Sequence, residues 1–395
     1  MSALLNGEPE GCRSLIPGGC STRVPGRFPP PGGIEVELDH GPSLATRWFN
    51  GTVTGQARVV EALQRIAYLL ERAREPTYRV RAFRNAAATI SALGDDELRG
   101  RVQAGTLTEL RGIGKVTAEV VTEALSGETP VYLRRLEATG GQPVAEGGAE
   151  IRAALRGDLH THSDWSDGGS PIADMVAAAQ ALGHEYIALT DHSPRLTVAN
   201  GLSAERLRRQ LDALAELNAG SGGIRVLTGI EVDINEDGSL DQSDDLLGRL
   251  DVVVASVHSK LRMPQEEMTR RMVTAIANPH VDVLGHCTGR LVTGGRGTRP
   301  ESAFDAEVVF AACARFGVAV EINSRPERLD PPKRLLRLAV EAGCQFAVNT
   351  DAHAPGQLDW QPYGCERAAA CGVPLENIVN TWAVQDLLSW TAQQS

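Results

Sequence analysis

The sequence predicts an α/β protein, a (β/α)7 TIM-like barrel with a small all-α domain at its N-terminus, and three observations lead to this fold class. From Arg156 onward, short apolar segments alternate with helical segments, which is the pattern of β/α units around a parallel sheet. Residues 56–125 show helical periodicity alone. Histidines and carboxylates follow most of the predicted strands, and active sites of closed β/α barrels are built at the C-terminal ends of the strands.

Length and composition limit the class of protein. With 395 residues, of which 42% are hydrophobic, the chain can bury a full core, and its length predicts two or three domains. No apolar run approaches membrane-spanning length, and the N-terminus lacks the basic start and apolar block of a signal peptide. We therefore expect a soluble cytoplasmic protein. The seven cysteines are scattered without a C-x-x-C pair, which argues against a disulfide framework and against a thiolate zinc site.

The first 130 residues divide into a tail and a helical domain. Residues 1–50 are rich in glycine and proline and have no helical or strand period, so we predict a disordered tail. Residues 51–130 are predicted to be helical. One amphipathic helix begins at Gln56 and ends near Pro76, and a second helix is closed by Gly94.

A glycine hairpin lies in the third helical segment, residues 107–125. The pattern predicts a short helix, a tight turn at Gly112-Ile113-Gly114 and a further helix. The glycines permit close approach of another backbone, and the first-turn N–H groups of the following helix, together with Lys115, suit a phosphate group. The alternative interpretation is an ordinary turn between two packed helices.

Charge is distributed unevenly along the chain. Residues 56–135 contain thirteen Lys and Arg against ten Asp and Glu, so this segment carries a net charge near +3 and the remainder near −14. A basic segment on an acidic body is typical of an enzyme with a domain that binds a phosphate backbone. The alternative is that the arginines form a solvated helix face without a partner.

This helical segment resembles the N-terminal helix-hairpin-helix domain of bacterial family-X DNA polymerases. The residues that carry the resemblance are 78–84, Ala86-Ala87 and 107–118. The resemblance implies that the domain binds the DNA backbone without sequence specificity. The DNA contacts are expected at Gly112, Ile113, Gly114 and Lys115.

Residues 131–155 are predicted to be a linker, because they are rich in glycine and short of apolar residues. In the family-X polymerases a nucleotidyltransferase palm fills this place, and so short a segment cannot encode one. Polymerase activity is therefore not expected of this chain. The remaining residues, 156–395, are predicted to form the barrel.

Seven strands are predicted in the barrel, and side chains with metal-binding chemistry follow them. The predicted strands are 157–160, 186–190, 225–230, 251–256, 281–284, 318–322 and 346–349. Six of them run into His, Asp or Glu: His160 and His162, Asp191 and His192, Glu231, His258, His286, and Asp351 and His353. The sixth strand ends in Glu321-Ile322-Asn323-Ser324-Arg325. Of the other histidines, His40 lies in the tail, and His184 and His280 precede strands, so no role is assigned to these three.

These residues predict a multinuclear metal site for phosphoester hydrolysis. Six histidines meet at one face of the barrel with Asp167, Glu231 and Asp351, and nine N/O ligands suit two or three divalent ions such as Zn²⁺, Mn²⁺ or Fe²⁺. Glu231 is placed to bridge two ions. Closely spaced ions generate hydroxide near neutral pH and clamp the phosphate oxygens. Arg325 is expected to contact the substrate phosphate as a fork-shaped donor.

The same motifs resemble the polymerase-and-histidinol-phosphatase (PHP) domain over roughly residues 156–375. The motifs are His160-Thr161-His162 with Asp167-Gly168, Thr190-Asp191-His192, Gly229-Ile230-Glu231, Ser256-Val257-His258, Gly285-His286 and Asp351-Ala352-His353. The resemblance implies a distorted seven-stranded barrel with three metal ions. It implies one ion held by His160, His162, Glu231 and Asp351, a second by Glu231, His258 and His286, and a third by Asp167, His192 and His353.

One residue departs from the family pattern. Cys287 follows the predicted ligand His286 at a position where proline is expected. A cysteine beside a ligand is either an accessory metal ligand or a packed thiol, and its chemistry favours the packed thiol.

Two phosphoester substrates are compatible with these patterns. In the first interpretation, the helical domain delivers DNA ends, and the enzyme is a DNA-repair 3′–5′ exonuclease or 3′-phosphatase, with a separate polymerase or repair factors as candidate partners. In the second, the barrel is a small-molecule phosphomonoesterase of the histidinol-phosphatase type. The basic segment and the hairpin favour DNA. A third interpretation, a non-catalytic DNA-end binder, is disfavoured by the complete set of predicted ligands.

Overall fold

The structure is a computed structural model that describes residues 54–140, 144–220, 223–294 and 297–392. Residues Gly51–Ser395 belong to one compact unit, distinct from Met1–Asn50. The predicted tail, including His40, lies outside the described residues. Because the helical region and the barrel fall in the same compact unit, the boundaries placed near residues 130 and 156 stay predictions.

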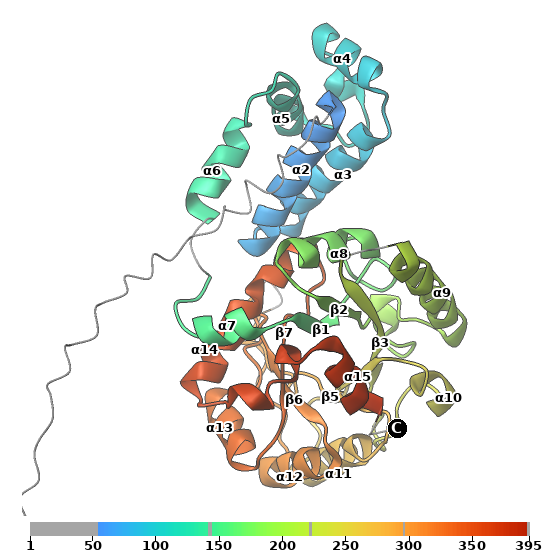
Figure 1. Cartoon of the computed structure of the whole chain (residues 1–395), viewed down its shortest axis with the longest axis vertical. Helices are drawn as coiled ribbons and strands as arrows, with labels where there is room; N and C mark the ends of the chain where they lie inside the picture. The colour runs from blue at the N-terminus through green and yellow to red at the C-terminus, as the bar shows by residue number, and fades with distance from the viewer. Residues whose placement is uncertain (1–53, 141–143, 221–222, 295–296, 393–395) are drawn as a thin grey trace, which may run out of the picture. The chain divides into compact units, whose positions relative to one another are not determined.

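Seven parallel strands form the barrel, in the order of the sequence, and this confirms the predicted fold class (Figure 1). The strands are β1 (Gly157–Thr161), β2 (Tyr186–Leu189), β3 (Arg225–Asp233), β4 (Val252–Ser256), β5 (Val283–Leu284), β6 (Ala319–Asn323) and β7 (Phe346–Asn349). Beyond the last strand, a parallel bridge joins Thr161 to Ala352, so the first and last strands approach each other and the barrel is nearly closed.

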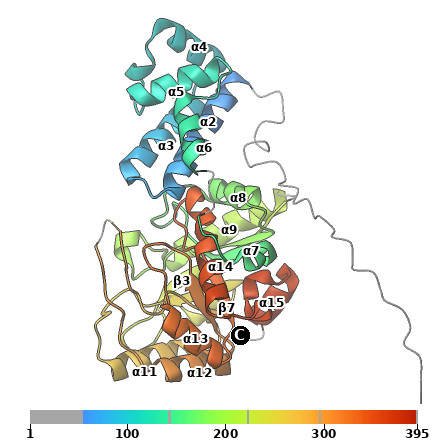
Figure 2. The ribbon, with the colours of Figure 1, turned by 90° about the vertical axis from the view of Figure 1, so that its left-hand side faces the viewer.

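Helices follow the strands and cover the outside of the barrel (Figures 1 and 2). They are α8 (Ile172–Ala181), α9 (Ala204–Gly220), α10 (Asp244–Leu247), α11 (Gln265–Ile276), α12 (Ala306–Phe316), α13 (Lys333–Glu341) and α14 (Gln361–Ala370). The last helix, α15 (Val384–Ala392), packs instead on the opposite layer of strand side chains through Leu387. Strand residues alternate between two apolar layers. Val252 and Val254 belong to the cluster that contains Leu387, whereas Val253 and Ala255 belong to the cluster that contains the helix residues Met268 and Phe310. Strands buried on both faces explain the continuous apolar runs in the sequence.

The helical region confirms the predicted helix, turn and helix around the glycine hairpin. It contains α2 (Gly55–Arg72), α3 (Thr77–Ser91), α4 (Asp95–Ala104), the 3₁₀ turn η1 (Leu107–Glu109) and α5 (Lys115–Leu125). The first helix ends at Arg72, four residues before the predicted end, and α4 was not predicted. Only Leu98 of α4 is buried, so this helix has almost no apolar periodicity to detect.

Two helices lie in the segment that was predicted to be a linker. They are α6 (Val131–Gly140) and α7 (Ala149–Ala154). Leu133 of α6 is buried in the same apolar cluster as Leu63 and Leu70 of α2. Contacts with α2 stabilise this helix, which explains why a short segment with few apolar residues does not look helical by its own pattern. No helix among the described residues is long and apolar enough to span a membrane.

Candidate functional site

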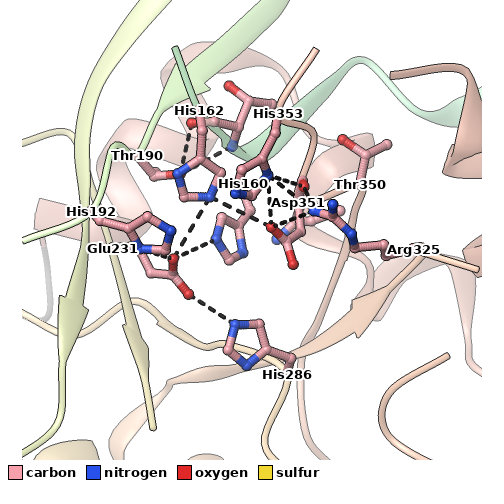
Figure 3. Close-up of polar contacts among 12 residues, drawn as sticks. His160, His162, Thr190, His192, Glu231, His286, Arg325, Thr350, Asp351 and His353 are labelled. Atoms are coloured by element: carbon pink, nitrogen blue, oxygen red, sulfur yellow. Dashed lines mark hydrogen bonds and ion pairs between the residues drawn. The ribbon is translucent and has the colours of Figure 1, made fainter. Parts of the chain in front are cut away.

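All nine predicted ligands come together at the C-terminal ends of the strands, and Figure 3 shows most of them around Glu231. β1 ends in His160 and Thr161, and His162 follows it directly. Asp167 lies in the loop after β1, and Glu231 lies within β3, two residues before its end. The remaining ligands follow β2, β4, β5 and β7, as the strand pattern predicted. The parallel order of the strands brings these segments, which are distant in sequence, to one face.

Glu231 lies at the centre of the cluster and is buried. Its carboxylate oxygens lie 2.8 Å from Nδ1 of His192 and 2.9 Å from Nε2 of His286. The Nε2 atoms of His258 and His160 lie 3.2 and 3.4 Å away. Burial by itself would raise the pKa of Glu231, but the surrounding imidazoles, His258 first, hold the pKa well below its ordinary value. The centre of the site is therefore a carboxylate anion.

Within the described part of the chain, three groups of side chains have potential ligand atoms within 4.8 Å of one another. The groups are His162, Asp167, His192 and His353; His160, His162 and Asp351; and His192, Glu231 and His258. The first contains the whole predicted set for the third ion. The second lacks Glu231 from the set predicted for the first ion, and the last has His192 where His286 was expected. The partition of ligands among individual ions stays a prediction.

The donor chemistry of the cluster fits divalent cations. Several of its buried atoms have polar neighbours but make no hydrogen bond: Nε2 of His160, both ring nitrogens of His162 and His258, Nδ1 of His286 and Oε2 of Glu231. Burying so many polar atoms without hydrogen bonds is costly. Imidazole nitrogens and carboxylate oxygens are also the ligands that zinc and related divalent ions prefer. These residues therefore form a multinuclear cluster suited to metal ions.

Glu321 is a functional residue that the sequence did not reveal as part of the site. Its fully buried carboxylate accepts hydrogen bonds from Nδ1 of His160 at 2.6 Å and from the backbone N–H of His286 at 2.7 Å. The contact holds the proton of His160 on Nδ1 and directs Nε2 toward Glu231, an arrangement typical of metal-binding histidines. The sequence did contain a signal for Glu321, because it lies near the end of the sixth strand, as the predicted ligands lie at the ends of the other strands.

A second buried carboxylate, Asp191, organises the loop that carries Asp167. It accepts hydrogen bonds from the backbone N–H of Ser163 at 2.8 Å, from the Ser166 hydroxyl at 2.5 Å and from Nε2 of Gln210 at 2.6 Å. Burial raises the pKa of Asp191, and these donors oppose that rise. Asp191 therefore holds the loop that carries Asp167 in place by these hydrogen bonds. It belongs to none of the potential ligand groups among the described residues.

Two arginines contact Asp351 at the edge of the cluster. Nη1 of Arg325 donates to the backbone oxygen of Asp351 at 2.8 Å and lies 3.0 Å from Nδ1 of His353. Nε of Arg328, a residue not predicted from the sequence, lies 3.1 Å from the Asp351 carboxylate. Burial alone would raise the pKa of Asp351, but Arg325 and Arg328 hold the pKa well below its usual value. The Arg325 side chain keeps 21% of its surface exposed, so it can still reach a substrate.

Cys287 and two histidines lie outside the cluster. Cys287 is buried, its Sγ faces Asp330 at 3.8 Å, and burial raises the pKa of the thiol well above its ordinary value. This environment supports a packed thiol. His184 precedes β2 and contacts Oε1 of Gln361 at 3.2 Å, and His280 precedes β5. Neither histidine belongs to a potential ligand group among the described residues.

The glycine hairpin has the tight geometry that the sequence predicted. Gly112 has φ of 88°, and a Cβ there would lie 3.3 Å from Oγ1 of Thr89 on α3. Gly114 is the N-cap residue of α5 and has no side chain to accept from the first-turn N–H groups. Lys115 is exposed at the start of α5. Ile113 differs, because its side chain is buried in the helical core and its backbone N–H donates to the backbone oxygen of Leu110 at 3.1 Å.

Comparison with known proteins finds two families along the chain. Residues 158–325 match the PHP domain, and residues 55–130 match a helix-hairpin-helix domain. The chain is 40% identical over 233 residues to the "DNA polymerase/3'-5' exonuclease PolX" of Bacillus subtilis (strain 168). This match covers 59% of the chain but only 40% of the Bacillus protein.

Other relatives match about half of the chain. The chain is 31% identical over 207 residues to a "Probable phosphatase" of Thermoanaerobacter sp. (strain X514), a match that covers 50% of this chain and 78% of that protein. Among solved structures, a histidinol phosphate phosphatase from Lactococcus lactis, complexed with zinc, L-histidinol and phosphate, is similar with a TM-score of 0.39 and 19% identity. That match covers 55% of this chain and 92% of the Lactococcus chain.

Proposed function

This chain belongs to the PHP-domain phosphoesterases and carries a helix-hairpin-helix domain at its N-terminus, and from this premise we propose that it processes the 3′ ends of DNA. The proposed reaction is metal-dependent hydrolysis of a phosphoester bond, as a 3′–5′ exonuclease or a 3′-phosphatase. Only residues 131–157 lie between the two matched families, and so short a segment cannot encode a polymerase palm, so polymerase activity is not proposed.

The histidine and carboxylate cluster would hold two or three ions of Zn²⁺, Mn²⁺ or Fe²⁺. The proposed ligands are His160, His162, Asp167, His192, Glu231, His258, His286, Asp351 and His353. When bound, such ions neutralise phosphate oxygens and lower the pKa of water at the site. Glu231 remains ionised among its imidazole neighbours and is suited to lie between two cations.

Arg325 is proposed to contact the substrate phosphate. Its guanidinium is held against Asp351 and His353 while part of it stays exposed to solvent. A planar guanidinium offers paired N–H donors that match two oxygens of a phosphate group. In this position Arg325 would orient the phosphoester beside the metal ligands.

One observation supports DNA as the substrate: the same chain carries the buried ligand cluster and the glycine hairpin. The hairpin offers the N–H groups at the start of α5 and the ammonium of Lys115, and both suit a backbone phosphate. Arg81 on α3 and Arg111 before the hairpin are also exposed. Contacts of this kind hold DNA by its backbone without reading the bases.

A small-molecule phosphomonoesterase is the alternative function. The similarity to a protein named as a probable phosphatase, 78% of whose length is matched by half of this chain, supports it. In this case the helical region would serve a purpose other than substrate binding. The two functions differ in substrate and share the same proposed ions.

The test compares two substrates with the same protein preparation. A 5′-labelled single-stranded oligonucleotide, with either a 3′-hydroxyl or a 3′-phosphate, and histidinol phosphate are incubated with Mn²⁺ and again after chelation. Metal-dependent shortening, or loss of the 3′-phosphate, supports DNA 3′-end processing. Turnover of histidinol phosphate alone would refute it and support the alternative function.

A further inference from the structure

We propose that the C-terminal end of α2 is a positioning element for Arg325, so that the helical region acts on the chemistry of the site as well as on DNA. The helix contacts the segment that follows the metal-ligand residue His353, and two routes of contact continue from there to the Arg325 guanidinium. The proposal rests on the phosphoesterase function proposed above, and it goes beyond it by assigning residues outside the cluster a role in the reaction.

The contact between α2 and the barrel is buried and specific. The 3₁₀ segment η3 (Pro355–Trp360) begins two residues after His353. Oε2 of Glu71, near the end of α2, accepts a hydrogen bond from the backbone N–H of Gly356 at 2.9 Å. Glu71 is 6% exposed, and its other oxygen pairs with Arg84 of α3 at 2.6 Å. A buried carboxylate with this set of partners fixes the distance between the two segments.

Gly356 permits the close approach of the two backbones. A Cβ at this position would lie 2.2 Å from the backbone oxygen of Tyr68 and 3.0 Å from the backbone nitrogen of Arg72. Backbone atoms inside a helix cannot move aside as a flexible side chain does. Any side chain at residue 356 must therefore push η3 away from α2.

The first route from α2 to the site passes through Trp360. Its indole Nε1 donates to the backbone oxygen of Arg72 at 3.0 Å, so the end of the helix sets the position of the ring. The ring in turn lies under the guanidinium of Arg325, with 5.8 Å between Cζ and the ring centroid. A guanidinium is attracted to the face of an indole at this separation.

The second route passes through Glu327. Nε of Arg74, just beyond the end of α2, lies 3.0 Å from Oε1 of Glu327, and Oε2 of Glu327 lies 3.7 Å from Nε of Arg325. The same η3 segment also contacts a predicted ligand, because Oε1 of Gln357 accepts from the backbone N–H of His353 at 2.8 Å. Both routes therefore end at the edge of the cluster where Arg325 contacts Asp351 and His353.

The role of each residue follows from these contacts. Arg325 is the group expected to touch the substrate, whereas Trp360, Glu71 and Gly356 act only through it and are positioning residues. A long arginine side chain has many rotamers. The Trp360 ring, the Glu327 carboxylate and the Asp351 backbone oxygen select one of them for Arg325. If η3 moves away from α2, the Trp360 ring moves with it and the guanidinium loses the contact with the ring.

The experiment uses the full chain and two variants of different severity. Gly356→Ala inserts a methyl group between η3 and α2. Trp360→Phe removes the N–H donor to Arg72 and keeps an aromatic ring near Arg325. Gly220→Ala is the matched control, because a Cβ at Gly220 meets no atom within 4 Å. Hydrolysis of a small chromogenic phosphodiester with Mn²⁺ avoids any contribution of DNA binding.

We expect Gly356→Ala to lower kcat/KM for this ester by roughly 10- to 100-fold, because a displacement of about 1 Å in a positioned group has effects of this size. Trp360→Phe should lower it several-fold, and the control should match the wild type. In an Arg325→Ala background, Trp360→Phe should change kcat/KM by less than about twofold, because its effect passes through the missing side chain. An equal loss in both backgrounds would overturn the proposal, and so would wild-type activity in Gly356→Ala.

Amide hydrogen exchange provides a readout that does not depend on activity. In the metal-free protein, the amide of Gly356 should be protected by Glu71, and peptides that cover η3 should exchange faster in Gly356→Ala but not in Gly220→Ala. Unchanged exchange in η3 would overturn the proposal. If the wild type hydrolyses no phosphoester, the proposed function fails by itself, and the exchange comparison still decides whether α2 holds η3.

Discussion

Replacing Glu321 by glutamine should weaken metal binding although Glu321 is not a predicted ligand. Four donors converge on this carboxylate: His160 Nδ1 at 2.6 Å and Asn349 Nδ2 at 3.1 Å on Oε1, and the His286 backbone N–H at 2.7 Å and Asn323 Nδ2 at 3.1 Å on Oε2. Burial by itself would raise the pKa of Glu321, but His160 lowers it below its ordinary value, so the group is an anion. Glutamine keeps the shape, removes the charge and replaces one acceptor oxygen by an NH₂ group.

The loss of folding free energy in Glu321→Gln follows from the number of donors that lose their acceptor. Whichever way the amide is turned, two of the four donors face an NH₂ group. A buried donor without an acceptor costs about 1–3 kcal/mol, so the variant should lose roughly 2–6 kcal/mol of folding free energy. The imidazole of His160 also loses the partner that orients it. Loss of such a partner lowers metal affinity about 10- to 100-fold, which corresponds to about 1.4–2.7 kcal/mol.

The assay measures both quantities. Competition with a chromogenic chelator gives the affinity for Mn²⁺ or Zn²⁺, and urea unfolding without metal gives the change in stability. The exposed Glu307 on α12 provides the control, because Glu307→Gln makes the same chemical change on the surface. If Glu321→Gln binds these ions as tightly as the wild type, the interpretation that Glu321 orients His160 toward a metal is refuted.

Three further predictions address the ions, the hairpin and the pH dependence of stability. His160→Ala or Asp351→Ala should abolish hydrolysis and leave DNA affinity nearly unchanged, and chelation of the wild type should do the same; turnover by the metal-stripped protein would contradict the proposed chemistry. Lys115→Glu should weaken DNA binding, with a salt slope smaller by about one, while hydrolysis of a small ester continues. Equal DNA affinity of this variant and the wild type in a salt titration would make the hairpin purely structural. Burial, assisted by Arg152, lowers the pKa of His184 to about 3. The folded state therefore keeps His184 neutral while the unfolded state takes up a proton below pH ~6.5, so stability decreases as the pH falls, by about 2 kcal/mol between pH ~7 and ~5 for this group. His184→Gln should lose that part of the slope in urea unfolding, and identical slopes would argue that His184 is not held neutral.

Much of the barrel is visible in the sequence for a physical reason. Strands buried on both faces are apolar at nearly every position, as in Val252, Val253, Val254 and Ala255 of β4, and such short runs between helical segments are recognisable. The short helices α4 and α6 are not recognisable in this way. Each buries one side chain, Leu98 or Leu133, so their helical state depends on the partner against which that side chain packs.

The sequence by itself determined which chemical groups the site contains. Parallel strands in a barrel present their C-terminal ends at one face, so histidines and carboxylates that follow successive strands had to meet there. The glycine hairpin was equally visible, because a residue such as Gly112 with φ of 88° needs the conformational freedom of glycine.

Only the tertiary structure decided which of these groups touch and what holds them. Glu321 contacts His160 across 161 residues of sequence, and Glu71 contacts Gly356 across 285. No local pattern encodes such pairs, because they arise from the curvature of the sheet and from the packing of α2 on η3. The same packing decides which side chains lose water, and burial together with neighbouring charge sets the protonation of Glu231 and Asp351.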